Sequence, residues 1–123
     1  MASSLERFAR FGIVGAGNTL LYTALAAGFV NFVAPWPAAA NAVAYVICTV
    51  CSFALNTLWS FSAPLTARAL LRFCAVSALG FVMTVAIAQA VDVLGGHYLV
   101  GIACVVLVVT PCTFLAHRNW TYR

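Results

Sequence analysis

Four apolar segments, each long enough to cross a lipid bilayer, account for most of this chain. They cover about residues 11–34, 38–59, 73–91 and 98–116, and short segments separate them. A hydrocarbon core about 30 Å thick needs roughly 20 helical residues to cross it. Only 7% of the 123 residues are charged, against roughly 25% in soluble globular domains. We therefore expect an all-α membrane protein, with one transmembrane domain of four helices over residues 1–123.

The positive charges lie beside alternate ends of these segments. They are the arginines Arg7, Arg10, Arg68, Arg72, Arg118 and Arg123. Two precede the first segment, two separate the second from the third, and two follow the fourth, whereas the other two loops hold none. The positive-inside rule places arginine-bearing loops in the cytoplasm. Both termini are therefore expected on the cytoplasmic side.

The sequence also repeats itself. Residues 53–61 (FALNTLWSF) align with residues 114–122 (FLAHRNWTY) at an offset of 61, and Arg10-Phe11 aligns with Arg72-Phe73 at an offset of 62. This predicts two helical hairpins, over about residues 7–62 and 69–123. Because each hairpin is expected to start and end on the same side, the repeats are predicted to be parallel and not inverted.

Polar residues follow one face of the second apolar segment. At 100° per residue they fall within an arc of about 80°, and they are Asn41, Tyr45, Thr49, Ser52, Asn56 and Trp59. Lipid offers such groups no partners, so the stripe is expected to face other helices or a water-filled cavity. It either joins helices by hydrogen bonds or lines a polar groove, and for the two asparagines the alternatives are evenly balanced.

The first segment combines small residues with a polar face. Asn18 and Tyr22 lie one turn apart on the same side of a helix. Gly12, Gly15 and Gly17 lie nearby. Small residues of this kind are expected to let a neighbouring helix approach closely.

Several donors are predicted to gather at the cytoplasmic end of the helices. They are Arg10, Asn18, Asn56, Arg72, His117 and Arg118. Because arginine offers planar, bidentate and permanently charged recognition, a phosphate is the anion that suits this set. The alternative is that the arginines only fix topology and contact lipid head groups, and we favour this for Arg7, Arg68 and Arg123.

Other functional classes find little support. The net charge of +4 contains no basic run that would suggest nucleic-acid binding. No carboxylate lies inside an apolar segment, which argues against a proton relay, and no catalytic set of serine, histidine and acid is visible. Cys48 and Cys51 form a CxxC but are expected to pack as small apolar residues. We expect no enzyme activity, no cofactor and no bound metal.

The duplicated motif resembles that of the GtrA-like family of small bacterial membrane proteins, whose repeated mark is approximately F-x-x-N-R-x-W-x-F. In the first copy Asn56, Trp59 and Phe61 match, and Thr57 replaces the arginine. In the second copy the matches are Arg118 and Trp120, and the replacements are His117 for asparagine and Tyr122 for phenylalanine.

The resemblance implies that the protein moves a polyprenyl-phosphate-linked sugar across the bacterial cytoplasmic membrane during synthesis of cell-surface polysaccharide. The phosphate would meet the six donors named above. The sugar would pass along a polar groove formed by Tyr22, Asn41, Tyr45, Thr49, Ser52, Trp59 and Trp120. The leading alternative is a non-transporting anchor for a membrane glycosyltransferase, and a small multidrug exporter is disfavoured because it normally needs an acid in the membrane. A homo-oligomer in contact with membrane lipid is a further expectation, because four helices enclose little volume.

Overall fold

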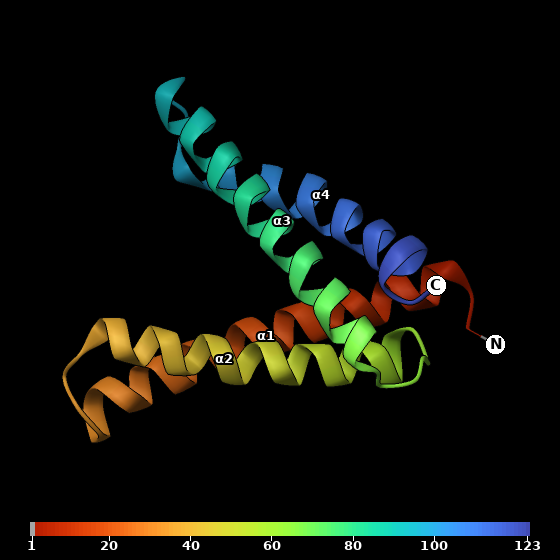
Figure 1. The fold of residues 1–123 in the computed structure, drawn as a ribbon. Coiled ribbons are helices and arrows are strands. Elements are labelled where there is room, and N and C mark those ends of the chain that lie inside the picture. Colours follow the sequence, from red (N-terminus) through yellow and green to blue (C-terminus); the bar gives the residue numbers. More distant parts are fainter. Residues whose placement is uncertain (1) are drawn as a thin grey trace. The chain divides into compact units, whose positions relative to one another are not determined.

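Four long helices make up the computed structural model, which describes residues 2–123 and has no β-strand in that range. They are α1 (Ser4–Phe32), α2 (Pro37–Leu55), α3 (Ala67–Val93) and α4 (Tyr98–Ala116) (Figure 1). A short π-helical segment directly follows two of them, η1 (Asn56–Ser60) after α2 and η2 (His117–Thr121) after α4. All four helices are long and apolar enough to cross a membrane. The prediction of an all-α, multi-pass membrane protein is confirmed.

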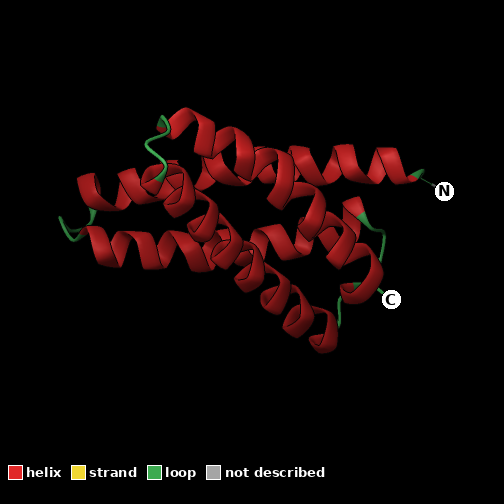
Figure 2. Cartoon of the chain, turned by 90° about the horizontal axis from the view of Figure 1, so that it is seen from above, coloured by secondary structure: helices red, strands yellow, loops and turns green. Residues whose placement is uncertain are grey.

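The chain divides into two compact units, one ending at Pro64 and the other beginning at Leu65. In the first unit α1 packs against α2 and η1, and in the second α3 packs against α4 and η2. Each unit is therefore a helical hairpin, and short loops join the helices (Figure 2). In each hairpin we call the end that holds the π-helical segment the arginine end, and the end at the loop between the two long helices the loop end.

The first helix of each hairpin begins well before its apolar segment. A capping box starts α1: Ser3 Oγ accepts from the Glu6 amide at 3.2 Å, and Glu6 Oε2 accepts from the Ser3 amide at 2.9 Å. At α3 the Thr66 hydroxyl accepts from the Ala69 amide at 3.1 Å. Such caps satisfy amides that have no partner within the helix. As a result Arg10 and Arg72 lie on helices, not in the loops where the sequence suggested them.

The glycines of α1 do not mediate helix contact within the first hairpin. A Cβ built on Gly12, Gly15 or Gly17 meets no described atom within 4 Å, because this side of α1 is exposed and Val14 lies buried instead. The close approach occurs in the second hairpin, where a Cβ on Gly80 would lie 2.9 Å from Thr113 Cγ2. The prediction of a close-packed glycine face on α1 is wrong for its contact with α2.

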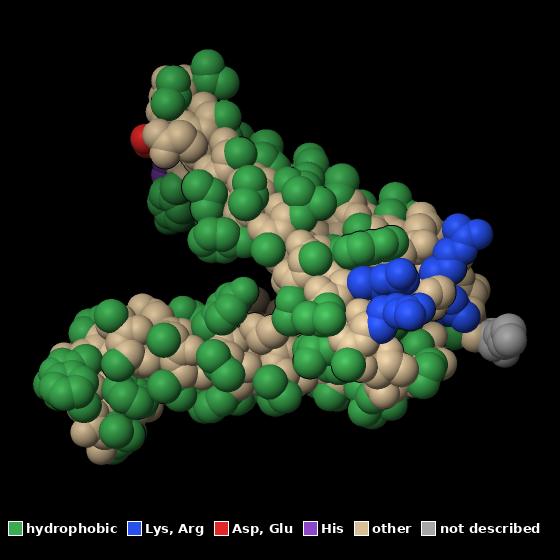
Figure 3. All heavy atoms as spheres, viewed as in Figure 1, with side chains coloured by type: hydrophobic (Ala, Val, Ile, Leu, Met, Phe, Trp, Pro, Cys, Tyr) green, Lys and Arg blue, Asp and Glu red, His purple; other side chains and the backbone are tan. Residues whose placement is uncertain are grey.

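The hairpins expose large apolar side chains along their length. Leu20 of α1 and Leu107 of α4 are each 74% exposed, and Phe81 of α3 is 65% exposed. Figure 3 shows hydrophobic side chains spread along the helices of both hairpins. In water such a surface would be unfavourable, but lipid tails are as apolar as these side chains. This surface therefore faces the bilayer or other membrane-embedded protein.

Candidate functional site

The duplicated sequence motif forms the same backbone structure in both hairpins. In η1 the Phe61 amide donates to the Asn56 carbonyl oxygen at 2.9 Å, and in η2 the Tyr122 amide donates to the His117 carbonyl oxygen at 3.0 Å. These bonds span five residues, and they are related by the sequence offset of 61. π-helical turns are rare and often occur at functional sites. Because they recur at the duplicated motif, the arginine ends of the hairpins are the candidate functional site.

An arginine from the first helix of each hairpin contacts a tryptophan of the π-helical segment. Arg10 Nη1 donates to the Trp59 carbonyl oxygen at 3.0 Å, and Arg72 Nη1 donates to the Trp120 carbonyl oxygen at 2.8 Å. Each guanidinium also lies over the indole ring, 5.5 Å from the Trp59 centroid and 5.3 Å from that of Trp120. These distances are within the range of cation–π attraction. We call them the arginine–tryptophan pairs.

Each π-helical segment begins with a buried polar residue that bonds to side chains one turn away. Asn56 is 2% exposed; its Oδ1 accepts from Ser60 Oγ at 3.0 Å, and its Nδ2 donates to Ser52 Oγ at 3.2 Å. His117 is 3% exposed, and its Nδ1 lies 3.0 Å from Thr121 Oγ1. Since buried polar groups are costly without partners, these bonds give Asn56 and His117 a structural role within their own hairpins.

The phenylalanine after each arginine completes the contact between helices. In the second hairpin the Phe73 ring stacks on His117 with centroids 4.7 Å apart and an interplanar angle of 18°. In the first, Phe11 meets Phe61 edge to face at 6.2 Å. The repeated Arg-Phe dipeptide thus supplies both the cation above the tryptophan and an aromatic ring packed against the π-helical segment or its cap.

A groove lies beside the arginine–tryptophan pair of the first hairpin. Its cavity volume is about 330 Å³, and its lining residues are Ile13, Val14, Gly17, Asn18, Leu21, Cys51, Leu55 and Trp59. Asn18 and Trp59, both predicted site residues, therefore line one space. The walls are otherwise apolar, apart from Cys51, so Asn18 and Trp59 are the two side chains that combine polarity with access to this groove.

The other predicted site residues either form a hydrogen-bonded pair or lie partly or fully exposed on their hairpin. Near the loop end the Tyr22 hydroxyl donates to Asn41 Oδ1 at 2.8 Å and so bridges α1 and α2. Tyr45 is 54% exposed and Thr49 is half-buried. Arg118 is exposed, whereas Thr57, at the equivalent position of the first hairpin, is fully buried. The polar stripe on the second segment is therefore not one continuous lining within its hairpin.

Sequence reasoning missed the buried hydroxyls of Ser60 and Thr121. Both are almost fully buried and partner the central polar residue of their hairpin. The signal was present, because a hydroxyl recurs at this position of the motif at the offset of 61. In an isolated sequence, however, serine and threonine near a membrane interface are common enough to escape attention.

A profile of the GtrA/DPMS transmembrane domain matches residues 10–122. The match begins at Arg10 and ends just after Trp120, so it includes both arginine–tryptophan pairs. This chain belongs to the GtrA/DPMS transmembrane family. GtrA/DPMS membership makes it a membrane protein of glycan-related synthesis. A search of curated proteins found no match.

Proposed function

We propose that this GtrA/DPMS protein moves a polyprenyl-phosphate-linked sugar across a bacterial cytoplasmic membrane for cell-surface polysaccharide synthesis. The observation that carries the proposal is the arginine–tryptophan pair, which recurs in both hairpins at the end of long apolar helices. In the first hairpin the tryptophan also lines a groove. No bond of the substrate needs to break, so the proposed activity is transport and not catalysis.

The phosphate suits the guanidinium groups. A guanidinium has five N–H donors in a fixed fork, and the carbonyl of Trp59 takes one from Arg10. The remaining donors can bind a phosphate in a bidentate way, with the shorter and stronger hydrogen bonds of an ionised pair. Because the indole ring and the carbonyl hold the guanidinium in place, little side-chain entropy is lost when the anion binds.

The groove of the first hairpin suits the part of the carrier next to the phosphate. Its walls are mostly apolar, as an isoprenyl chain requires, and Asn18 adds one carboxamide that can both donate and accept. The rest of the polyprenyl tail can stay in the bilayer. The protein then needs to shelter only the polar head group, which is the part that lipid tails would exclude.

The proposal is tested by reconstitution. Full-length protein in proteoliposomes is expected to speed the access of a polyprenyl-phosphoryl hexose to a membrane-impermeant oxidant on the opposite side, relative to protein-free liposomes. The double variant Arg10→Gln/Arg72→Gln is expected to lose this acceleration. The matched control is Arg7→Gln/Arg68→Gln, which removes the same charge from the same two helices and is expected to keep it.

The same variants separate transport from the anchoring of a glycosyltransferase. Wild-type protein that fails to change the rate of access, yet co-purifies with a membrane glycosyltransferase, would contradict the proposal and favour the anchor. Loss of lipid-sugar binding in Arg10→Gln/Arg72→Gln with co-purification intact would instead exclude anchoring as the purpose of the arginine–tryptophan pairs.

A further inference from the structure

The two hairpins differ at their loop ends. In the first hairpin the Tyr22 hydroxyl donates to Asn41 Oδ1 and joins the two helices. The repeat offsets of 62 and 61 align Tyr22 with Thr84 and Asn41 with Ile102. Neither partner of that bridge is present in the second hairpin. At this place a groove with a cavity volume of about 440 Å³ opens between α3 and α4, and both Thr84 and Ile102 line it.

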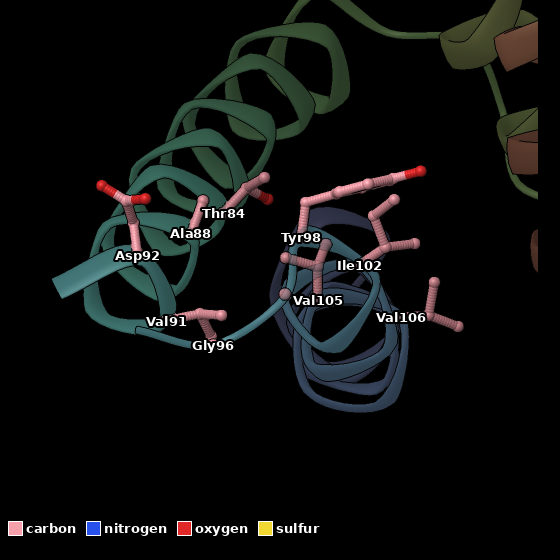
Figure 4. Close-up of a pocket in the computed structure, with 10 residues that line it drawn as sticks. Thr84, Ala88, Val91, Asp92, Gly96, Tyr98, Ile102, Val105 and Val106 are labelled. Carbon is pink, nitrogen blue, oxygen red and sulfur yellow. The ribbon is translucent and has the colours of Figure 1, made fainter. Parts of the chain in front are cut away.

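The walls of this loop-end groove come from one face of each helix. Figure 4 shows Thr84, Ala88 and Asp92 on the α3 side and Tyr98, Ile102 and Val105 on the α4 side. The α3 residues follow one another at intervals of four, so they line about 12 Å of the helix. Most of the lining is apolar. The exceptions are a hydroxyl, a carboxylate and a phenol.

Each of these three groups has capacity left for a ligand. The Thr84 hydroxyl donates to the Gly80 carbonyl oxygen at 2.8 Å, and its oxygen can still accept. The Tyr98 ring packs beside the His97 ring, with the two centroids 4.4 Å apart, but Tyr98 is 70% exposed, so its hydroxyl and the remaining ring surface are accessible. Asp92 is exposed at the last turn of α3 and accepts hydrogen bonds through two oxygens. Together they offer mainly acceptors and an aromatic surface.

The charge at the loop end is opposite to that at the arginine end. Asp92 is the only acidic residue of the second hairpin, and the arginines of this hairpin lie at the start of α3 and at or after η2. A phosphate in contact with Asp92 would be repelled, whereas hydroxyl groups would donate to its carboxylate, so a phosphorylated ligand would place its hydroxyls against Asp92 and its phosphate away from it. Thr84 and Asp92 lie about 12 Å apart along α3. Together with the apolar wall and the aromatic ring, these two separated acceptors favour a ligand with several hydroxyls over one with a single ammonium group, which would reach only one of them.

We propose that the loop-end groove of the second hairpin binds the glycosyl part of a lipid-linked sugar. This inference rests on the proposed function and adds a second contact to it, at the opposite end of the hairpin from the arginines. The sugar hydroxyls donate to Asp92 and Thr84, and an apolar face of the sugar packs on the Tyr98 ring. The first hairpin, bridged by Tyr22 and Asn41, does not provide this contact.

The test uses the full chain in lipid nanodiscs and a phosphate-free alkyl glycoside with a photoreactive diazirine on its sugar. Wild-type protein is expected to be labelled between residues 84 and 102. Asp92→Asn is expected to lower this labelling at least about tenfold, because charge-assisted hydrogen bonds are lost. Glu6→Gln is the matched control, since it removes the other carboxylate yet can keep the capping box, and it is expected to be labelled like wild type.

A second variant transplants the bridge of the first hairpin. Thr84→Tyr/Ile102→Asn is expected to fill the groove and abolish the labelling, and its thermal unfolding shows whether it folds. Three results would overturn the inference. The first is a failure of the glycoside to label wild-type protein, and the second is labelling of Asp92→Asn that is as strong as that of wild type. The third is stronger labelling of wild type by an ethanolamine phospholipid that carries the same diazirine. If one of these results is found and the protein still transports the lipid-linked sugar, the inference about the groove is wrong but the proposed function stands. If the glycoside labels the groove but no transport occurs, the proposed function fails instead.

Discussion

Arg72 Nη1 donates to the carbonyl oxygen of Trp120 at 2.8 Å while its guanidinium lies over the Trp120 ring. The carbonyls at the end of a helix have no amide to accept from within the helix. The arginine therefore supplies a missing donor at η2, and Arg10 does the same for Trp59 at η1. In each hairpin one arginine thus stabilises the end of the hairpin and presents its other N–H donors beside the tryptophan.

The buried hydrogen bonds at Asn56 predict a specific loss of stability. Asn56→Ala leaves the hydroxyl of Ser60, which is fully buried, without its partner. A buried polar group without a partner costs about 1–3 kcal/mol. We expect the thermal unfolding temperature in detergent to fall accordingly. Asn119→Ala is the control, because Asn119 is exposed on η2, and an equal fall in that variant would argue against the assigned role.

His117 and Asn56 are predicted to be interchangeable. His117→Asn places in the second hairpin the carboxamide that the first hairpin uses, and it can bond to Thr121 as Asn56 bonds to Ser60. We expect its stability to stay within about 1 kcal/mol of wild type, whereas His117→Leu should lose about 1–3 kcal/mol because Thr121 is buried without a partner. Thermal unfolding of both variants decides the matter. Equal destabilisation of His117→Asn and His117→Leu would mean that His117 stabilises the protein by a contact other than its hydrogen bond to Thr121.

Gly80 is predicted to tolerate substitution less well than Gly15. In Gly80→Ala the new methyl group would lie 2.9 Å from Thr113 Cγ2, so α3 and α4 must separate or the threonine must move, at a cost of about 1–3 kcal/mol. Gly15→Ala meets no described atom within 4 Å. Both changes add the same methyl group to a helix, so a difference in unfolding temperature reports packing. Equal effects would contradict the close approach at Gly80.

The sequence predicted the four helices and their pairing because membrane-spanning segments need long apolar runs and the motif was visibly duplicated. It also singled out Arg10, Arg72, Trp59 and Trp120, although it treated the arginines first as markers of orientation. Their pairing depends on the helices that continue past the apolar runs, which the caps at Ser3 and Thr66 determine. The cytoplasmic placement of the termini stays a prediction.

Two features of the fold were harder to foresee. The π-helical turns occur at the duplicated motif, but the residue types of the motif do not by themselves distinguish a bond that spans five residues from the usual bond that spans four. The groove at Thr84 and Ile102 results from side chains that are smaller or less polar than those of the first hairpin. Such a space appears only when both helices are placed, because either residue alone is ordinary in an apolar segment.

The most direct test of the central claim is the binding of polyprenyl phosphate to the arginine–tryptophan pairs. Native mass spectrometry of detergent-solubilised protein can compare wild type with Arg10→Gln/Arg72→Gln and with Arg7→Gln/Arg68→Gln, which carry the same net charge as each other. We predict that the first variant raises the Kd at least about tenfold, since each charge-assisted hydrogen bond contributes roughly 1.5–3 kcal/mol, and that the second changes it little. Equal weakening in both variants, or none in either, would contradict the account.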